Sequence, residues 1–162
     1  IAIGQGIAIT PLHLLMAISA IANGGSLLRP SLVFEAVDGR GQKIYSGEKR
    51  PITRVLSEET ATWLRSAMRK VVTHGTGTRV NSDLVAIAGK TGTAQVAVRG
   101  QYKEKLWVSS FVGFWPYENP KYAMIVVIGE PSMGEYYGGS VAGPVFKDIV
   151  EDIIRVNSLE TI

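Results

Sequence analysis

The sequence contains no cysteine among its 162 residues. This absence excludes a disulfide framework, a cysteine nucleophile and any zinc site built on thiolates. The only histidines, His13 and His74, are isolated and have no paired acidic motif. We therefore expect both to be structural, and we expect neither a metal ion nor a cofactor.

Long apolar runs and basic clusters are also missing. No apolar stretch reaches the roughly 18 to 20 residues that a membrane-spanning helix needs, and no basic segment leads into a cleavable apolar one. The 17 basic and 14 acidic residues are scattered along the chain, without the basic patches that bind nucleic acid. The chain begins with Ile1 instead of methionine, which we interpret as a piece of a longer protein.

What is present is the composition of a folded domain, with 46% hydrophobic and 19% charged residues. Thr10 and Pro11 form an N-cap and first-turn pair, and Asn23 with two following glycines ends a helix. We therefore expect a helix over residues 11–22. Apolar residues surround its axis almost completely, which predicts burial on all sides.

Two further helices follow from capping and periodicity. Ser57 caps the first, over residues 58–73, and Pro144 stands in the first turn of the second, over residues 142–156. The first has the apolar stripe Leu64, Ala67, Met68 and Val71, and its water-facing side is Arg65, Arg69 and Lys70. The stripe of the second is Val145, Phe146, Ile149, Val150, Ile153 and Ile154.

The remaining segments have the pattern of strands. Residues 29–55 are interrupted by proline and glycine, and 32–37 is the best strand within them. Three longer strands are expected near 85–98, 106–115 and 121–129. Their short connections predict an antiparallel meander. The expected fold class is therefore α+β.

The first and third strands of this meander differ in the polarity of their side chains. The unbroken apolar run 122–128 is typical of a central strand with both faces buried. Thr91, Thr93 and Gln95 instead place polar side chains on one side of the first strand, which marks it as the edge. A polar linker over 99–105 is expected to join it to the second strand.

The sharpest feature is the segment 89–95, Gly-Lys-Thr-Gly-Thr-Ala-Gln, on the predicted edge strand. A strand edge can bind an extended peptide through its backbone, and Gly92 leaves room for close approach. Lys90 brings a positive charge and Thr91 a hydroxyl, which suit a substrate carboxylate or a serine hydroxyl network. The N–H of Thr93 can be one donor of an oxyanion hole. The alternative is a solvated lysine beside threonines that merely favour strands.

Other short motifs extend along the chain. In order they are Ile3-Gly4-Gln5-Gly6-Ile7 before Thr10-Pro11-Leu12, Ala22-Asn23-Gly24-Gly25, Gly75-Thr76-Gly77-Thr78, Phe111-Val112-Gly113-Phe114, Asn119-Pro120-Lys121-Tyr122-Ala123, and Tyr136-Tyr137-Gly138-Gly139-Ser140 with Pro144-Val145-Phe146. Together with 89–95 they resemble the class B penicillin-binding proteins in order and spacing. The Tyr-Tyr-Gly-Gly segment is more similar to the division (septal) type than to the elongation type.

The resemblance implies a peptidoglycan D,D-transpeptidase, which cross-links the cell wall by acyl transfer from D-Ala-D-Ala stem peptides and is acylated by penicillin. It implies that residues 1–162 are the C-terminal portion of one transpeptidase domain of the penicillin-binding-protein and serine β-lactamase-like fold. It also implies a membrane-anchored parent whose domain is extracytoplasmic. Its partners would be stem peptides, β-lactams, the missing N-terminal half of the domain, and the machinery of cell-wall synthesis and division.

The family builds its site from Ser-x-x-Lys, Ser-x-Asn and Lys-Thr-Gly, and only the third matches here. The resemblance implies that Lys90 and Thr91 bind the substrate carboxylate, that Gly92 gives access, and that Thr93 supplies an oxyanion N–H and a second hydroxyl. Lys90 and Thr93 are thus the expected catalytic residues, and Lys90, Thr91, Gly92 and Thr93 the expected substrate-binding residues.

Ser46-Gly47-Glu48-Lys49 does spell Ser-x-x-Lys, but we reject it as the nucleophile motif. The serine and lysine should lie one turn apart on a buried helix, whereas Gly47 and Pro51 disfavour a helix here. We expect a solvated loop. No Ser-x-Asn occurs in the sequence.

Other segments receive structural interpretations. The aromatic residues Trp107, Phe111, Phe114 and Trp115 on one strand are expected to pack the sheet instead of forming a sugar platform. Residues 136–140 join the last strand to the last helix, and we expect them to shape the cleft beside Lys90.

Two alternative functions stay open. A serine β-lactamase or D,D-carboxypeptidase shares the Lys-Thr-Gly logic but hydrolyses the acyl-enzyme, and the flanking motifs disfavour it. A binding or regulatory module could keep the fold without the catalysis.

Overall fold

The computed structural model describes residues 7–47, 50–98, 101–131 and 134–159. In chain order its elements are α1 (Pro11–Ala22), β1 (Ser26–Leu28), β2 (Glu35–Val37), β3 (Lys43–Ser46), β4 (Pro51–Arg54), α2 (Glu58–His74), the 3₁₀ turn η1 (Thr78–Val80), β5 (Ala88–Val98), β6 (Gln101–Trp115), β7 (Tyr122–Gly129) and α3 (Gly138–Leu159). Helices and an antiparallel sheet occur together, so the predicted α+β class is confirmed.

The three long strands form one antiparallel sheet in the order β5-β6-β7. Lys90 on β5 lies opposite Val112 on β6. The predicted meander is confirmed, and so is the edge position of its first strand. The connection predicted over 99–105 is shorter than expected, because β6 already begins at Gln101, which pairs with Val98.

The prediction that β7 is a central strand concerns a larger sheet, whose further strand would lie outside this chain. Within the described ranges the central strand is β6, and β7 has a strand on one side alone. Its apolar run arises because α1 packs on one face and α3 on the other. At the open edge Tyr122 and Val127 are 42% and 44% exposed. An apolar run therefore reports covered faces and does not reveal whether the strand's edges are paired.

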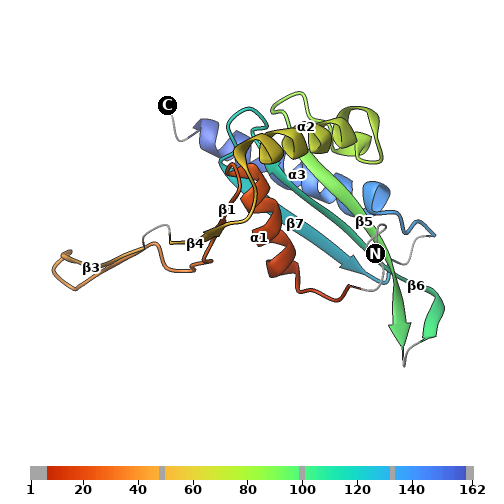
Figure 1. Ribbon diagram of the computed structural model, residues 1–162, viewed down its shortest axis with the longest axis horizontal. Helices are drawn as coiled ribbons and strands as arrows, with labels where there is room; N and C mark the ends of the chain where they lie inside the picture. The colour runs from red at the N-terminus through yellow and green to blue at the C-terminus, as the bar shows by residue number, and fades with distance from the viewer. Residues whose placement is uncertain (1–6, 48–49, 99–100, 132–133, 160–162) are drawn as a thin grey trace.

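Two hydrophobic cores fill the two faces of the sheet, with α1 in front of it and α3 behind it in Figure 1. The core under α3 comprises Val72, Val80, Ile87, Phe111, Trp115, Ala142, Phe146 and Val150, and the core under α1 comprises Ile18, Ala22, Met68, Ala88, Val112 and Phe114. The Phe146 ring meets Phe111 edge-on at 4.8 Å between centroids and Trp115 at 5.8 Å. The predicted packing role of Phe111, Phe114 and Trp115 is confirmed, because none is more than 1% exposed.

Helix α1 begins and ends where the sequence predicts. Thr10 caps it by accepting a hydrogen bond from the backbone N–H of His13, and Pro11 occupies its first turn. The predicted burial on all sides is wrong in this chain: Leu12 is 52% exposed, whereas Ile18 is buried. One side of the helix packs on the sheet, and the other has no covering element within the described residues.

Helix α2 also follows the prediction, with the Ser57 hydroxyl accepting from the backbone N–H of Thr60 at 3.1 Å. The expectation that Arg65 and Arg69 face water is wrong. Arg65 donates to the carbonyl oxygen of Tyr117 at 2.9 Å, and Arg69 donates to that of Ile87 at 2.8 Å. These carbonyls flank β5 and β6, so the two arginines fasten α2 to the sheet.

Helix α3 begins at Gly138, earlier than the predicted residue 142. The N–H groups of Ser140 and Val141 donate to the Tyr137 carbonyl and wind an additional first turn. Pro144 therefore lies inside the helix and not in its first turn. The predicted stripe is half right: Phe146 and Val150 are fully buried, whereas Val145 and Ile149 are 41% and 38% exposed.

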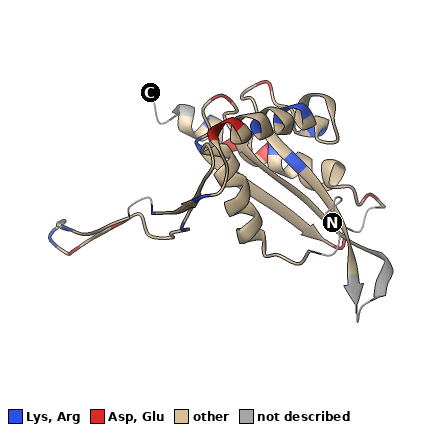
Figure 2. Cartoon of the chain, in the orientation of Figure 1, with Lys and Arg blue, Asp and Glu red and all other residues tan. Residues whose placement is uncertain are grey.

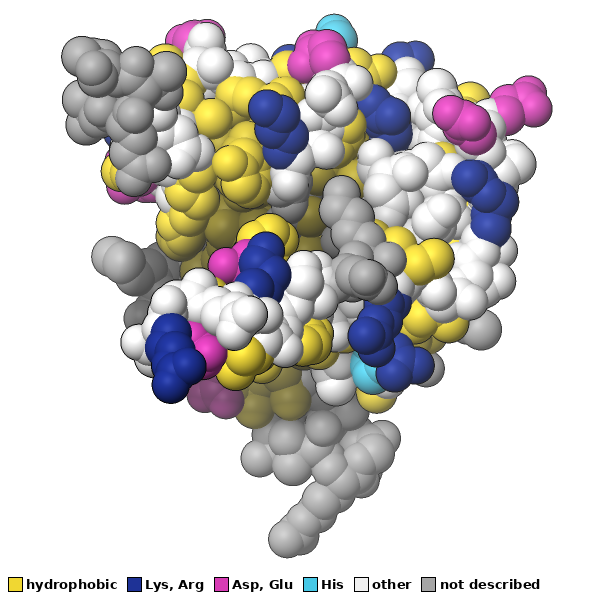
Figure 3. Space-filling view, turned by 90° about the vertical axis from the view of Figure 1, so that its left-hand side faces the viewer, with side chains coloured by type: hydrophobic (Ala, Val, Ile, Leu, Met, Phe, Trp, Pro, Cys, Tyr) yellow, Lys and Arg dark blue, Asp and Glu magenta, His cyan; other side chains and the backbone are white. Residues whose placement is uncertain are grey.

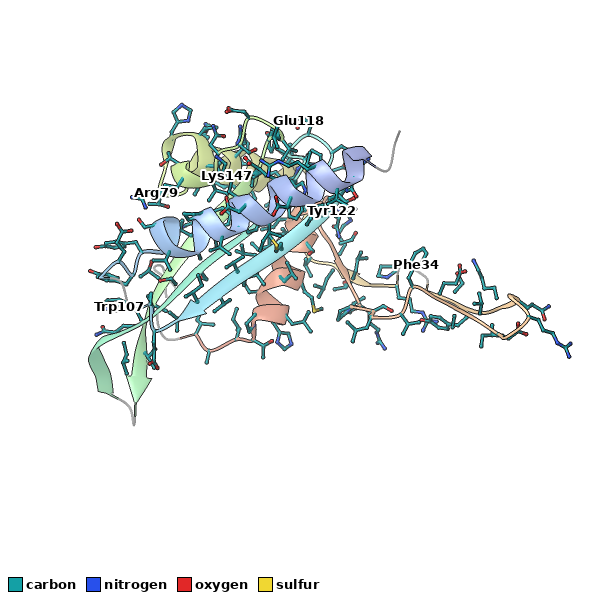
Figure 4. All side chains as sticks on the ribbon, turned by 180° about the vertical axis from the view of Figure 1, so that it is seen from behind. Phe34, Arg79, Trp107, Glu118, Tyr122 and Lys147 are labelled. Carbon is teal, nitrogen blue, oxygen red and sulfur yellow. The ribbon has the colours of Figure 1, made fainter. Side chains whose placement is uncertain are left out.

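The described residues of 29–54, here called the arm, project from the body of the molecule (Figure 1). β1 pairs with β4 and β2 pairs with β3, in two separate two-stranded sheets. Of the strand predicted over 32–37, just Glu35–Val37 is β-strand. Leu32 is fully exposed and Phe34, labelled on the arm in Figure 4, is 83% exposed.

Charge is spread over the helices and the arm, as Figure 2 shows. The sheet is different: of its described side chains, Lys90 alone is charged. No helix in the described ranges is both long and apolar enough to span a bilayer.

Candidate functional site

Lys90 lies on the exposed edge strand β5. Its ammonium donates to the carbonyl oxygen of Thr91 at 2.8 Å and to the Thr91 hydroxyl oxygen at 3.2 Å. The charge is therefore held over the next residue of the same strand and is accessible from solvent. The structure thus brings together Lys90 and Thr91, as the sequence predicts.

The Thr91 hydroxyl has a partner that sequence reasoning missed. Its oxygen lies 2.7 Å from the hydroxyl oxygen of Thr76, in the loop between α2 and η1. The N–H groups of Gly75 and Gly77 both donate to the Val71 carbonyl, at 3.1 and 3.0 Å, and so fix this loop to the end of α2. A threonine between two glycines was visible in the sequence, but nothing there pointed to Thr91.

Thr93 points to the same face of β5 as Thr91, two residues away. Its hydroxyl oxygen accepts a hydrogen bond from the backbone N–H of Gly138 at 2.9 Å. Directly opposite Thr93 on β6, the buried Ser109 hydroxyl donates to the Tyr136 carbonyl. The expectation that residues 136–140 lie beside the Lys-Thr-Gly strand is confirmed.

Glycines allow this close approach of backbone to backbone. A Cβ atom on Gly138 would collide with the carbonyl oxygens of Gly92 and Ser110, and one on Gly139 would collide with that of Thr76. Gly92 itself faces the Ser110 hydroxyl, which a Cβ would also strike. The sequence explained Gly92 by access for a substrate, and the structure adds a steric reason within the chain.

The edge is electropositive. Gly138 is the first residue of α3, and a helix amino end carries a partial charge of roughly +0.5. Lys90 adds a full positive charge nearby on the strand. Arg79 and Trp107 lie at the end of the molecule where α3 begins (Figure 4), and Arg79 is paired with Glu135 at 3.5 Å. The arrangement suits an anionic group that accepts hydrogen bonds from threonine hydroxyls.

Stacked aromatic rings border this edge. Trp107 lies parallel to Tyr136 at 4.4 Å between centroids, and Tyr137 follows at 4.6 Å from Tyr136. Hydrogen bonding with the Tyr137 hydroxyl, and then the charge of that group, raise the pKa of Tyr136 above its ordinary value. Tyr136 therefore stays neutral at physiological pH. The core packing predicted for Trp107 is therefore wrong: the ring is half-buried and stacks on this loop, outside both hydrophobic cores.

The remaining candidates lie elsewhere. Ser46 is solvent-exposed and not on a helix, as expected, but the predicted loop is wrong at this residue, because it is the last residue of β3; Lys49 lies outside the described residues. His13 and His74 are exposed, and their ring nitrogens contact the neighbouring Thr10 and Thr73 hydroxyls. In the part of the chain that the structure describes, no group of three or more His, Asp or Glu side chains gathers as metal ligands would.

Comparison with known proteins gives a consistent result. A family model described as the penicillin binding protein transpeptidase domain matches residues 1–151. Stage V sporulation protein D of Bacillus subtilis is 37% identical over 93% of this chain and 24% of its own length. The probable peptidoglycan D,D-transpeptidase PenA of Neisseria gonorrhoeae is 36% identical over 94% of this chain and 25% of its own length.

Solved structures show the same likeness. Penicillin-binding protein 3 from Mycobacterium tuberculosis superposes with a TM-score of 0.83 at 28% identity, over 96% of this chain and 37% of that one. The transpeptidase domain of Burkholderia pseudomallei penicillin-binding protein 3 gives 0.78 at 32% identity, over 94% and 44%. The chain thus spans about a quarter of these curated relatives and less than half of these solved chains.

Proposed function

The chain belongs to the penicillin-binding protein transpeptidase domain family, and from this premise we propose that the protein containing it is a peptidoglycan D,D-transpeptidase. It forms a serine ester with the acyl group of a D-Ala-D-Ala stem peptide, releases the terminal D-alanine and passes the acyl group to an amine of another strand. The names of relatives such as PenA support this reaction. The observation that carries it is the electropositive edge of β5, where the Lys90 ammonium contacts the Thr91 hydroxyl and the Thr93 hydroxyl lies on the same face of the strand as that of Thr91.

We assign the residues of this edge to distinct roles. Lys90 and Thr91 bind the carboxylate of the stem peptide, with the ammonium supplying charge and the hydroxyl a directed hydrogen bond. Gly92 lets the extended peptide lie close to the strand. The N–H of Thr93 donates to the oxyanion that develops at the scissile carbonyl, and its hydroxyl is a second donor to the carboxylate.

The nucleophile comes from outside these residues in this proposal. We infer that residues 1–162 form the C-terminal portion of the transpeptidase domain, and that the rest supplies the Ser-x-x-Lys and Ser-x-Asn motifs. The relatives' greater length and the position of Ser46 on β3 support this division. The parent protein is then membrane-anchored, with this domain extracytoplasmic, and it works with the machinery of cell-wall synthesis and division.

β-Lactams are the proposed inhibitors, because they mimic the stem peptide and present an anionic group, a carboxylate in the penicillins, beside a strained amide. Penicillin-binding protein 3 from Mycobacterium tuberculosis has been solved in complex with aztreonam and with ampicillin. Acylation by a fluorescent penicillin is therefore the natural assay for the proposed site.

The test compares this chain alone, the chain combined with the N-terminal half of the domain, and the same pair carrying Lys90→Ala. We expect no labelling of the chain alone and restored labelling of the pair on a denaturing gel. Loss of a charge-assisted contact of about 2 to 3 kcal/mol slows acylation roughly 30- to 200-fold in the Lys90→Ala pair. Lys70→Ala, which removes an exposed lysine on α2, is the matched control and keeps the wild-type rate.

Three results would contradict the proposal in different ways. Labelling of the isolated chain at Ser46 would make that serine the nucleophile, and an unchanged rate in Lys90→Ala would remove Lys90 from the site. A gene that encodes no Ser-x-x-Lys helix before Ile1 would favour a non-catalytic binding module.

A further inference from the structure

Thr76 ends a row of three polar groups at the β5 edge. The Lys90 ammonium lies 3.2 Å from the Thr91 hydroxyl oxygen, which lies 2.7 Å from the Thr76 hydroxyl oxygen. An ammonium group can donate hydrogen bonds but cannot accept them, whereas a hydroxyl has one hydrogen and two acceptor positions. Thr91 is therefore an acceptor toward Lys90, and the direction of its bond with Thr76 is the one remaining choice.

That choice decides what Thr91 can offer to a ligand. If Thr76 donates, both acceptor positions of Thr91 are filled and its hydrogen points to whatever binds at the edge. If Thr91 donates instead, its hydrogen is spent within the protein. A carboxylate accepts hydrogen bonds and cannot donate them, so its binding selects the first arrangement.

Thr93 provides an internal comparison. Its hydroxyl oxygen accepts from the Gly138 N–H at 2.9 Å, and a backbone N–H cannot reverse its direction. The hydrogen of Thr93 is therefore directed away from Gly138 in any state. If Thr76 donates, it fills an acceptor position of the Thr91 hydroxyl, as the Gly138 N–H does for Thr93. The Thr91 and Thr93 hydroxyls are then both hydrogen-bond donors on one face of the strand.

The loop that carries Thr76 is held in place from two sides. Its loop is fastened to α2 through the bonds from Gly75 and Gly77 to Val71. On the other side Gly139, at the start of α3, lies so close to the Thr76 carbonyl that a side chain would not fit between them. The backbone that carries the Thr76 hydroxyl is therefore held by contacts with α2 and with the start of α3.

We propose that Thr76 is a positioning residue that sets the direction of the Thr91 hydrogen bond and so makes Thr91 a donor to the carboxylate of stem peptides and β-lactams. The proposal rests on the transpeptidase function proposed above. Thr76 acts through Thr91 and does not itself touch the substrate.

The test uses the full-length protein and two ligands, a fluorescent β-lactam with its free carboxylate and the methyl ester of the same compound. Thr76→Val keeps the shape of the side chain and removes the hydroxyl, whereas Thr76→Ser keeps the hydroxyl. We expect Thr76→Val to slow acylation by the carboxylate ligand about 3- to 10-fold and to leave the slow reaction of the ester unchanged. Thr76→Ser restores the wild-type rate.

Two further variants separate positioning from general damage. Thr78→Val removes an exposed hydroxyl two residues away and is expected to react as wild type. In a Thr91→Val background, Thr76→Val is expected to have no further effect, because the residue through which it acts is gone. A folding defect would instead lower the rate in both backgrounds.

Each outcome is decisive. Equal slowing with acid and ester, failure of Thr76→Ser to restore the rate, a full effect in the Thr91→Val background, or no effect of Thr76→Val would overturn the positioning role. In these cases the wild-type protein is still labelled, so the transpeptidase proposal stands. If the wild-type protein reacts with neither ligand, the transpeptidase proposal fails and this inference falls with it.

Discussion

Glu151 is the residue on α3 whose ionisation depends most clearly on its surroundings. The Ser82 hydroxyl donates to its carboxylate at 2.8 Å, and Arg155 lies 3.1 Å away. The hydrogen bond from Ser82 is the largest cause that holds the pKa of Glu151 below its ordinary value of 4.5, partial burial opposes it, and Lys147 and Arg155 assist it. The carboxylate therefore ties the segment before β5 to the helix that covers the sheet.

This contact predicts a pH dependence of stability. A lowered folded-state pKa contributes stability above the ordinary glutamate value, and that stability is lost as the pH falls through the lowered pKa. We expect wild type to melt above Glu151→Gln at neutral pH, and the difference to shrink as the pH falls below about 4. The measurement is the thermal midpoint of the chain across a pH series.

Glu118→Gln, at an exposed site between β6 and β7, is the control and should follow wild type throughout. A difference between wild type and Glu151→Gln that does not change with pH would assign the effect to packing instead of charge.

At the scale of elements, the start of α3 packs against the edge of β5 through direct contact between the two backbones, here called the joint. Gly138 is its centre, because its N–H binds Thr93 and its Cα faces the carbonyl oxygens of Gly92 and Ser110. Carbonyl oxygens of a sheet cannot move aside as a flexible side chain can. The position of the Thr93 hydroxyl thus depends on a glycine in another element.

We expect Gly138→Ala to lower the free energy of unfolding of the chain by about 1 to 3 kcal/mol, as overpacking does. In the full-length protein it should also slow penicillin acylation, because the bond to Thr93 is broken. Urea denaturation and gel labelling measure the two effects. Gly129→Ala on β7 is the matched control, since a Cβ there meets nothing within 4 Å. Equal effects of the two substitutions would show that the joint does not matter.

The sequence predicted those elements that local signals define. Thr10 with Pro11, and Ser57, gave the starts of α1 and α2, and alternation gave the three long strands. The start of α3 was missed because glycines are poor helix formers, and Gly138 and Gly139 are needed there for close packing instead.

The candidate site was predictable to a similar degree. Lys90, Thr91 and Thr93 lie on one strand, so a single short sequence motif contains all three. The contact between Thr76 and Thr91 joins the loop after α2 to strand β5, and no local pattern encodes it. The same holds for Arg65 and Arg69, whose carbonyl partners become neighbours only when α2 packs on the sheet.

At the scale of the whole molecule, the main uncovered surface is the edge of β7 that has no strand partner within the described residues. The face from which the arm projects is hollowed, and hydrophobic side chains line much of the hollow (Figure 3). Ile149, Ile153 and Val156 of α3 border a hollow of about 300 Å³. An unpaired strand edge next to exposed apolar side chains favours pairing with another strand.

We therefore expect the isolated chain to self-associate with rising concentration, through pairing of β7 with a companion strand. Val127→Lys places a charge on this strand and should shift the chain toward monomer. Sedimentation at a series of concentrations measures both. Val55→Lys changes an equally exposed valine away from the sheet and is the control. A chain that stays monomeric at every concentration would contradict the prediction.

The arm has a different consequence, for how the molecule tolerates change. Its outer turn is self-contained: Asp38 accepts from the N–H groups of Arg40 and Gln42, and within the described residues β2 and β3 pair with each other alone. Lengthening such a turn is penalised only slowly as residues are added. We therefore expect residues 39–41 to tolerate an inserted sequence or a reporter group without a change in the geometry of the β5 edge.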